Sequence, residues 1–199
     1  ETLDLNGNDL TVTGTSTIAA AGTLTMGAGN FGATGDVTSA GTFTSAAGTE
    51  TLAGNLTVTA GAFTAGTGAT DLNGNLTISG GTYTATSGTT TLAGDIDSSG
   101  GGTFTHNSGT VTMDGTDQHF IGSNTFNNLS KTSAGAETLS FTAGTTQTVA
   151  GTLTLDGSAG NIITINDNGA ASGATINVTG SFGTIDFVDV TWNTLQDGG

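Results

Sequence analysis

The sequence predicts an all-β protein in which a single chain winds into a parallel β-helix (β-solenoid) of about ten coils, with roughly 20 residues in each. Three observations carry this prediction. The chain repeats itself at that period, apolar residues alternate with polar ones within each copy, and each copy closes with Gly-Asn or Gly-Asp. Gly and Thr dominate the composition and form helices poorly, so long helices are not expected.

The repeats are clearest in the first half of the chain, where three consecutive copies align almost without gaps and two related copies flank them. A fixed period of this length is typical of stacked, elongated proteins, in which each copy packs on its neighbours. The hexapeptide FGATGD (31–36) looks like an insertion that would bulge or reset the register. The five copies span residues 10–30, 37–55, 56–75, 76–95 and 96–117.

Each copy contains three short strand-like pieces, in which apolar and polar residues alternate with the period of two expected for strands. One apolar residue of each piece recurs at an equivalent position, so stacking should place these residues in continuous interior columns. The expected core columns are Phe43, Phe63, Tyr83 and Phe104, and Leu52, Leu72, Leu92 and Met113.

Glu50 conflicts with this alternation. A strand in strict alternation with Leu52 would place the Glu50 carboxylate inside, where an unpaired charge is very unfavourable. We therefore expect the strand to begin at Thr51 and Glu50 to lie at a corner.

The whole chain, residues 1–199, is expected to form one solenoid. Its coils should be regular over residues 1–117 and longer and looser over 118–183, where the spacing loosens but the alternation persists. Residues 184–199 are richer in large apolar groups and include Trp192, which would seal the interior as a cap or begin a contact with a following domain.

The composition also excludes several function classes. The chain has 35 Gly, more Thr than Gly, no Pro, no Cys, and 16 Asp and Glu against one Lys or Arg, for a net charge of −15. Without a basic patch it is not expected to bind nucleic acid or anionic membrane surfaces. No apolar stretch is long enough to cross a bilayer, so membrane insertion is not expected. Scarce Lys together with abundant Thr, Asn and Gly favours an extracellular or cell-surface location.

Residues 102–157, followed by IDFVDVTWN (185–193), resemble repeat segments of very large bacterial surface proteins. The Thr/Gly-rich repetition, which covers most of the chain, is also similar in style to the β-helical shafts of filamentous-haemagglutinin-like and autotransporter adhesins. The resemblance implies a secreted, right-handed parallel β-helix that serves as a shaft, an adhesin or a filament subunit. It transfers no catalytic or binding residue, because the matched positions are scaffold positions.

Enzymatic activity is not expected. The two histidines and the nearby Ser and Asp residues are the candidates for a hydrolase triad or a metal site. No G-x-S-x-G nucleophile elbow supports the triad, and the spacing of the residues is not diagnostic of metal ligands. Parallel β-helices also host polysaccharide lyases, but here Lys131 alone could neutralise an acidic sugar. The acids are scattered singly, not paired across a cleft. The triad or metal candidates are His106, Ser108, Asp114, Asp117, His119 and Ser123.

The Asn and Asp residues that close the coils have both a structural and a functional interpretation. Asp36, Asn55, Asn75 and Asp95 recur at the coil period, so they should stack at one corner. The stack would satisfy corner backbone groups as an Asn ladder, which we favour, or would offer oxygen ligands to Ca²⁺, with Asp36 and Asp95 as the weak candidates. No other cofactor is expected.

Lys131, the only side-chain amine, could form an isopeptide bond with an Asn.

Outward threonines are the sharpest functional feature. Thr-x-Thr pairs at matching positions would stack into two files of hydroxyl and methyl groups on one flat face. Such arrays resemble the ice-binding faces of some β-solenoid antifreeze proteins, although Thr is also simply a good exposed strand residue. The residues of this face are Thr42, Thr44, Thr64, Thr82, Thr84, Thr103 and Thr105.

The sequence therefore favours a non-enzymatic, extracellular β-solenoid that builds a surface filament, stalk or adhesin shaft by end-to-end or lateral assembly. The expected partners are copies of the chain or further repeats of it, and a surface glycan or receptor. An ice-binding protein is the alternative.

Overall fold

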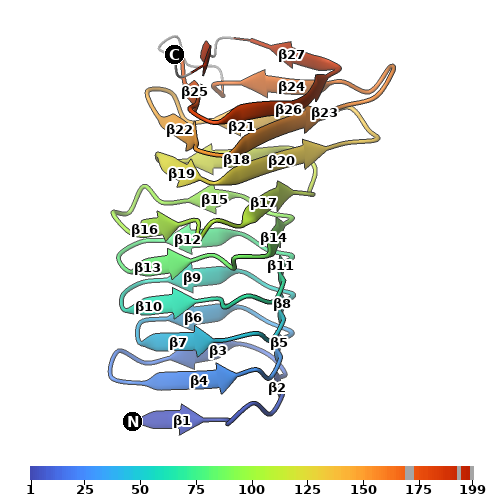
Figure 1. The fold of residues 1–199 in the computed structure, drawn as a ribbon. Coiled ribbons are helices and arrows are strands. Elements are labelled where there is room, and N and C mark those ends of the chain that lie inside the picture. The colour runs from blue at the N-terminus through green and yellow to red at the C-terminus, as the bar shows by residue number, and fades with distance from the viewer. Residues whose placement is uncertain (169–172, 192–193, 198–199) are drawn as a thin grey trace.

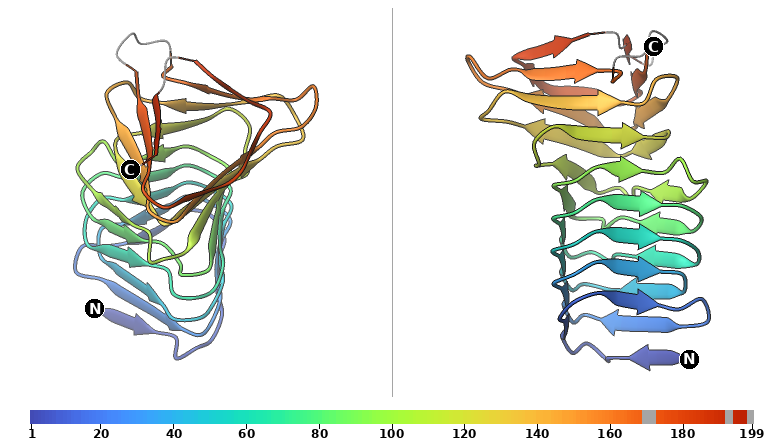
Figure 2. Two further views of the ribbon diagram at one scale, coloured as in Figure 1. Left: turned by 45° about the horizontal axis from the view of Figure 1, so that its top comes forward. Right: turned by 180° about the vertical axis from the view of Figure 1, so that it is seen from behind.

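The computed structural model confirms an all-β solenoid of about nine turns of roughly 21 residues. It describes residues 1–168, 173–191 and 194–197. The chain rises from the N-terminal to the C-terminal end as a right-handed coil, with strands stacked one above another (Figures 1 and 2). There are nine turns instead of the expected ten because the later coils are longer than 20 residues.

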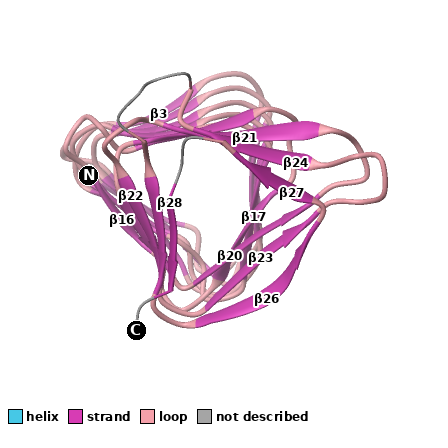
Figure 3. Cartoon of the chain, turned by 90° about the horizontal axis from the view of Figure 1, so that it is seen from above, coloured by secondary structure: helices cyan, strands magenta, loops and turns pink. Residues whose placement is uncertain are grey.

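All paired strands run parallel, and seen along the axis they form the sides of a three-sided coil (Figure 3). One side is sheet A, which sheet D replaces in the later coils. Sheet A contains β1 (Thr2–Asp4), β4 (Thr23–Gly27), β7 (Thr42–Ser45), β10 (Ala62–Thr64), β13 (Thr82–Thr84) and β16 (Thr103–Thr105). Sheet D contains β19 (Asn124–Phe126), β22 (Thr146–Val149), β25 (Thr175–Val178) and β28 (Thr194–Asp197).

The other two sides, sheets B and C, each run through nine strands. Sheet B contains β2 (Leu10–Val12), β5 (Phe31–Ala33), β8 (Glu50–Leu52), β11 (Thr70–Leu72), β14 (Thr89–Leu92), β17 (Thr110–Met113), β20 (Asn128–Thr132), β23 (Thr152–Asp156) and β26 (Ser181–Asp186). Sheet C contains β3 (Ser16–Ile18), β6 (Val37–Ser39), β9 (Leu56–Val58), β12 (Leu76–Ile78), β15 (Ile96–Asp97), β18 (Gln118–Ile121), β21 (Glu137–Phe141), β24 (Ile163–Asn166) and β27 (Val188–Val190).

The interior consists of side-chain columns, because each strand lies in register over its equivalent one coil earlier. Phe43 stacks on Phe63 with ring centroids 4.1 Å apart, and Tyr83 and Phe104 continue the column at 5.8 Å per step. Phe126 of β19 extends it into sheet D, 5.1 Å from Phe104. A second column joins Leu52, Leu72, Leu92 and Met113, all buried.

The coil lengthens towards the C-terminal end. In the regular part, Asn55 and Asn75 occupy equivalent corners 20 residues apart, whereas Thr152 and Ser181 lie one above the other 29 residues apart. The upper strands and loops extend beyond the outline of the lower coils (Figure 2). The rod is therefore regular below and wider above. Trp192, expected as a cap or junction, lies outside the described residues.

Two local expectations are wrong. Glu50 does not lie at a corner: it begins β8, points inward and is fully buried. The alternation of the strand holds, and the carboxyl group is accommodated by neighbouring hydroxyl groups. FGATGD is not an insertion either, because Phe31–Ala33 form β5 and pair in register with β8. The similarity of LTV in 10–12 to LTV in 56–58 is misleading, since the first belongs to sheet B and the second to sheet C.

No helix in the described part of the chain is long and apolar enough to span a membrane.

Candidate functional site

The Thr-x-Thr face lies on sheet A, where each central residue points inward and its two neighbours point outward. The register gives two parallel files, which the structure extends by one strand to Thr23 and Thr25 of β4. Ala62 is the one non-threonine between β4 and β16. The first file is Thr23, Thr42, Ala62, Thr82 and Thr103, and the second is Thr25, Thr44, Thr64, Thr84 and Thr105.

Sheet A differs in this respect from the other two sides of the regular coils. The short strands of sheets B and C have the opposite pattern, with two buried residues around one outward residue, as in β9 and β11. The outward residues of these short strands form one file per sheet, for example Thr57 and Thr77 on sheet C. The longer strands β14 and β17 of sheet B add a second outward file of Thr89 and Thr110 beside that of Thr91 and Thr112. In the described residues, a doubled Thr file that continues over five strands, interrupted at Ala62 alone, is found on sheet A.

The Asx corner column is a hydrogen-bonded ladder. Asp36 Oδ1 accepts the backbone N–H of Asn55 at 2.8 Å, Asn55 Oδ1 accepts that of Asn75 at 2.8 Å, and Asn75 Oδ1 accepts that of Asp95 at 2.7 Å. Asp95 Oδ1 in turn accepts the backbone N–H of His119 at 2.7 Å. Each side chain thus satisfies one corner N–H of the next coil.

The two Ca²⁺ candidates of this column are not neighbours. Asp36 and Asp95 are separated by the layers of Asn55 and Asn75, and each directs one carboxylate oxygen to a backbone N–H. No group of three or more His, Cys, Asp or Glu residues able to hold a metal ion occurs among the residues that the structure describes.

The residues considered for a triad lie apart. His106 follows β16, and its Nδ1 accepts the backbone N–H of Ser108 at 2.9 Å. His119 points outward from sheet C, with Nε2 3.2 Å from Thr142 Oγ1. Ser123 Oγ accepts the backbone N–H of Thr146 at 3.0 Å. His106 follows a strand of sheet A and His119 lies on sheet C, and each makes a structural contact.

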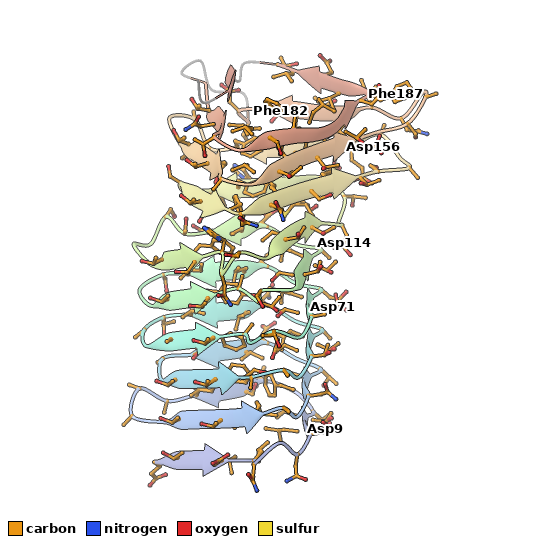
Figure 4. All side chains as sticks on the ribbon, viewed as in Figure 1. Asp9, Asp71, Asp114, Asp156, Phe182 and Phe187 are labelled. Carbon is orange, nitrogen blue, oxygen red and sulfur yellow. The ribbon has the colours of Figure 1, made fainter. Side chains whose placement is uncertain are left out.

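Acidic side chains lie singly at different heights along the side of sheet B, as Asp9, Asp71, Asp114 and Asp156 illustrate (Figure 4). Partial burial raises the pKa of Asp114, and the negative charge of Asp71 adds to this rise.

In the described residues the interior holds an ionic cluster that was not predicted from the sequence. Lys131 of β20 is 1% exposed, and its Nζ forms an ion pair of 2.6 Å with Glu137 Oε2 in β21. The same Nζ donates a hydrogen bond of 3.0 Å to Gln118 Oε1 in β18. It also donates to the carbonyl oxygen of Gly115. A charge taken out of water needs such partners, and here the lysine has three.

The sequence did contain a signal for this cluster. Lys131, Gln118 and Glu137 each stand two residues from a buried apolar residue of the same strand, and alternation therefore directs all three inward. The signal is weak because a lysine is ordinarily expected at the surface of a protein.

The last coil exposes residues that occupy core positions. Phe182 lies above buried Leu153, and Ile185 lies above buried Leu155, yet they are 42% and 38% exposed. Phe182 and Phe187 lie near the upper limit of the rod (Figure 4). At the opposite end Leu3 is 53% exposed and borders a shallow hollow of about 300 Å³.

Comparison of the chain with protein-family models, curated proteins and solved structures finds no match.

Proposed function

We propose that this chain is a structural β-solenoid that builds an extracellular or cell-surface filament, stalk or adhesin shaft through coil-on-coil stacking at its ends. The observation that carries the proposal is the continuity of the core columns into the last coil. Phe182 and Ile185 continue the columns of Leu153 and Leu155 in the manner of interior residues.

The two ends have the chemistry that such stacking requires. Residues in core positions at the upper end present apolar surface, and Leu3 does so at the lower end beside the hollow that Ile18 and Leu24 also line. A terminal strand of a parallel sheet also has unpaired backbone N–H and C=O groups along its free edge, which template pairing with another strand. A coil of the same kind would satisfy both needs.

The shaft function also has a mechanical basis. Sheets B and C run through nine strands each, so backbone hydrogen bonds follow the axis through the whole rod. The exterior carries most of the Thr and acidic residues, and a net charge of −15 keeps separate rods soluble and disfavours side-by-side contact. Two rods thus associate more readily through their ends than through their sides.

The experiment measures the mass and shape of the purified 199-residue chain over a range of concentrations, by size-exclusion chromatography with light scattering and by electron microscopy. We expect mass to rise with concentration through rods joined end to end. Phe182→Asp combined with Ile185→Asp should remain monomeric, because charge would enter the new core. Thr57→Asp, at an outward position in the middle of the rod, is the matched control. Only short monomers of the unmodified chain at high concentration would contradict the proposal.

A second candidate function, ice binding, is favoured by the doubled Thr file of sheet A. Strands about 4.8 Å apart, with outward residues about 6.7 Å apart along each strand, give a regular two-dimensional lattice of hydroxyl and methyl groups. Thermal hysteresis of the purified chain tests this function. Thr64→Tyr or Thr84→Tyr should abolish the activity, whereas Thr57→Tyr on sheet C should retain it. Absence of hysteresis in the unmodified chain excludes ice binding without bearing on the shaft.

A further inference from the structure

We propose that Lys131 and Gln118 form an intramolecular isopeptide bond with release of ammonia, and that Glu137 moves the protons. The bond would join Lys131 Nζ to Gln118 Cδ. It would link β18 of one coil to β20 of the next and thereby fasten two successive coils where the regular part of the rod meets the wider part. The inference does not depend on the function proposed above.

The geometry brings a nucleophile, an electrophile and a base together. Lys131 Nζ lies 3.0 Å from Gln118 Oε1, so the amide carbon next to that oxygen is within reach of the amine. Glu137 Oε2 lies 2.6 Å from the same Nζ. Reacting groups held in this way react as if at very high concentration, which compensates for the low reactivity of a carboxamide.

The orientation of the carboxamide is fixed on its other side. Gln118 Nε2 donates hydrogen bonds of 2.8 Å to the carbonyl oxygens of Leu92 and Gly94, so that Oε1 faces the lysine. Among the residues that the structure describes, Gln118 is the side-chain amide hydrogen-bonded to Lys131. The partner is therefore a glutamine, where the sequence suggested an asparagine.

Burial also keeps bulk water away from the three groups. Lys131 and Gln118 are each 1% exposed, and Glu137 is 15% exposed. The ion pair of 2.6 Å places the Glu137 carboxylate where it can take a proton from the Lys131 ammonium directly. The free amine is the nucleophile, and the acid can donate a proton to the amide.

The bonds and protons balance without a further reagent. Glu137 first takes a proton from Nζ, and the Nζ lone pair then attacks Cδ of Gln118 to give a tetrahedral intermediate. The Glu137 acid protonates Nε2, the Cδ–Nε2 bond breaks, and ammonia leaves. A second proton passes from Nζ through Glu137 to the departing ammonia, which leaves the site as ammonium. Glu137 returns to a carboxylate, so it acts as a general acid and base.

The test is the intact mass of the full chain, together with labelling of its amines after unfolding. With the bond formed, the mass should be lower than the sequence mass by one ammonia molecule. An amine-reactive reagent should then modify a single site, the N-terminus, because Lys131 is the only Lys or Arg in the chain. A protein of full sequence mass that labels at two amines would overturn the proposal.

The labelling separates this reaction from other losses of ammonia. An Asn-Gly sequence such as Asn6-Gly7 can cyclise with the same mass change, but Lys131 would then remain free to react, and that result would also overturn the proposal. Gln147 is an internal control. Gln147 is as deeply buried as Gln118, but it is hydrogen-bonded to the Asn124 amide and contacts no amine among the described residues. Peptide mapping should therefore find Gln147 unmodified.

Variants of Glu137 test the proton transfer. Glu137→Gln keeps the size of the side chain but cannot accept a proton, so the folded variant should retain the full mass and two reactive amines. Glu137→Asp keeps a carboxylate and should form the bond more slowly than the unmodified chain. A bond that forms equally fast in both variants would show that Glu137 has no part in the step.

Discussion

The Glu50 carboxyl group is held inside the solenoid by Thr70 of the next coil, whose Oγ1 donates a hydrogen bond of 2.9 Å to Glu50 Oε2. The other carboxyl oxygen has no hydrogen-bond partner within the described residues. Burial raises the pKa of Glu50 above 4.5, and the nearby hydroxyl groups of Ser45 and Thr70 oppose that rise only in part. The neutral acid is therefore the form that the core favours.

This pKa shift predicts that the protein loses stability as pH rises. A carboxyl group whose pKa is raised on folding contributes its full stabilisation below 4.5, the unfolded value, and loses it as pH increases through the folded pKa. Glu50→Gln, which is neutral at every pH, should raise the free energy of unfolding at neutral pH and change it little in acid. Urea unfolding at several pH values measures both. A variant less stable than the unmodified chain at neutral pH would contradict this account.

Tyr83 should tolerate loss of its hydroxyl group. The ring lies in the aromatic column and is fully buried, and burial raises the pKa of the hydroxyl to about 12. The Tyr83 oxygen makes no hydrogen bond of ordinary geometry with any described residue, although Thr90 is close by. Because an unpaired buried hydroxyl costs about 1–3 kcal/mol, Tyr83→Phe should leave the unfolding midpoint unchanged or raise it. A clear decrease would indicate a hydrogen bond that Tyr83 makes in solution.

The columns could be predicted from sequence because the coil repeats them. Phe43, Phe63 and Tyr83 stand at one position of successive copies, and period-two alternation fixes the direction of each. The fate of Glu50 and Lys131 could not be predicted in the same way. Alternation directs both side chains inward, but it does not show the partners that make their burial tolerable: Thr70 one coil later for Glu50, and Glu137 on the following strand for Lys131.

Phe63 should be among the most sensitive core positions. Its ring is fully buried, stacks on Phe43 at 4.1 Å and lies 5.8 Å from Tyr83. Phe63→Ala removes contacts to both neighbouring coils and should lower the free energy of unfolding by about 3–5 kcal/mol. Thr64→Ala, at the adjacent outward position, should change it by less than about 0.5 kcal/mol. Similar effects of the two substitutions, measured by denaturant unfolding, would be inconsistent with a packed column.

The Asx ladder should stabilise the corners without metal. Asn75 Oδ1 accepts the backbone N–H of Asp95 at 2.7 Å, so Asn75→Ala leaves that N–H to water and should cost about 0.5–1.5 kcal/mol. Addition of a chelator should leave the thermal midpoint of the unmodified chain unchanged. A midpoint that falls with chelator and recovers with Ca²⁺ would instead assign a metal-binding role to Asp36 or Asp95.

Stacked glycines leave no room for a larger residue at the corners between sheets A and B. A Cβ on Gly68 would meet the carbonyl oxygen of Gly48 directly below, at a separation no real contact allows, and Gly48 is related to Gly29 in the same way. Because the obstacle is backbone, relief requires a shift between whole coils, and Gly68→Ala should destabilise the protein by about 1–3 kcal/mol or more. Gly32→Ala is the matched control: its nearest neighbour is the Thr11 side chain at 3.7 Å, and it needs no unusual backbone conformation. Equal thermal midpoints for the two variants would mean that the coils do not stack this closely at the corner.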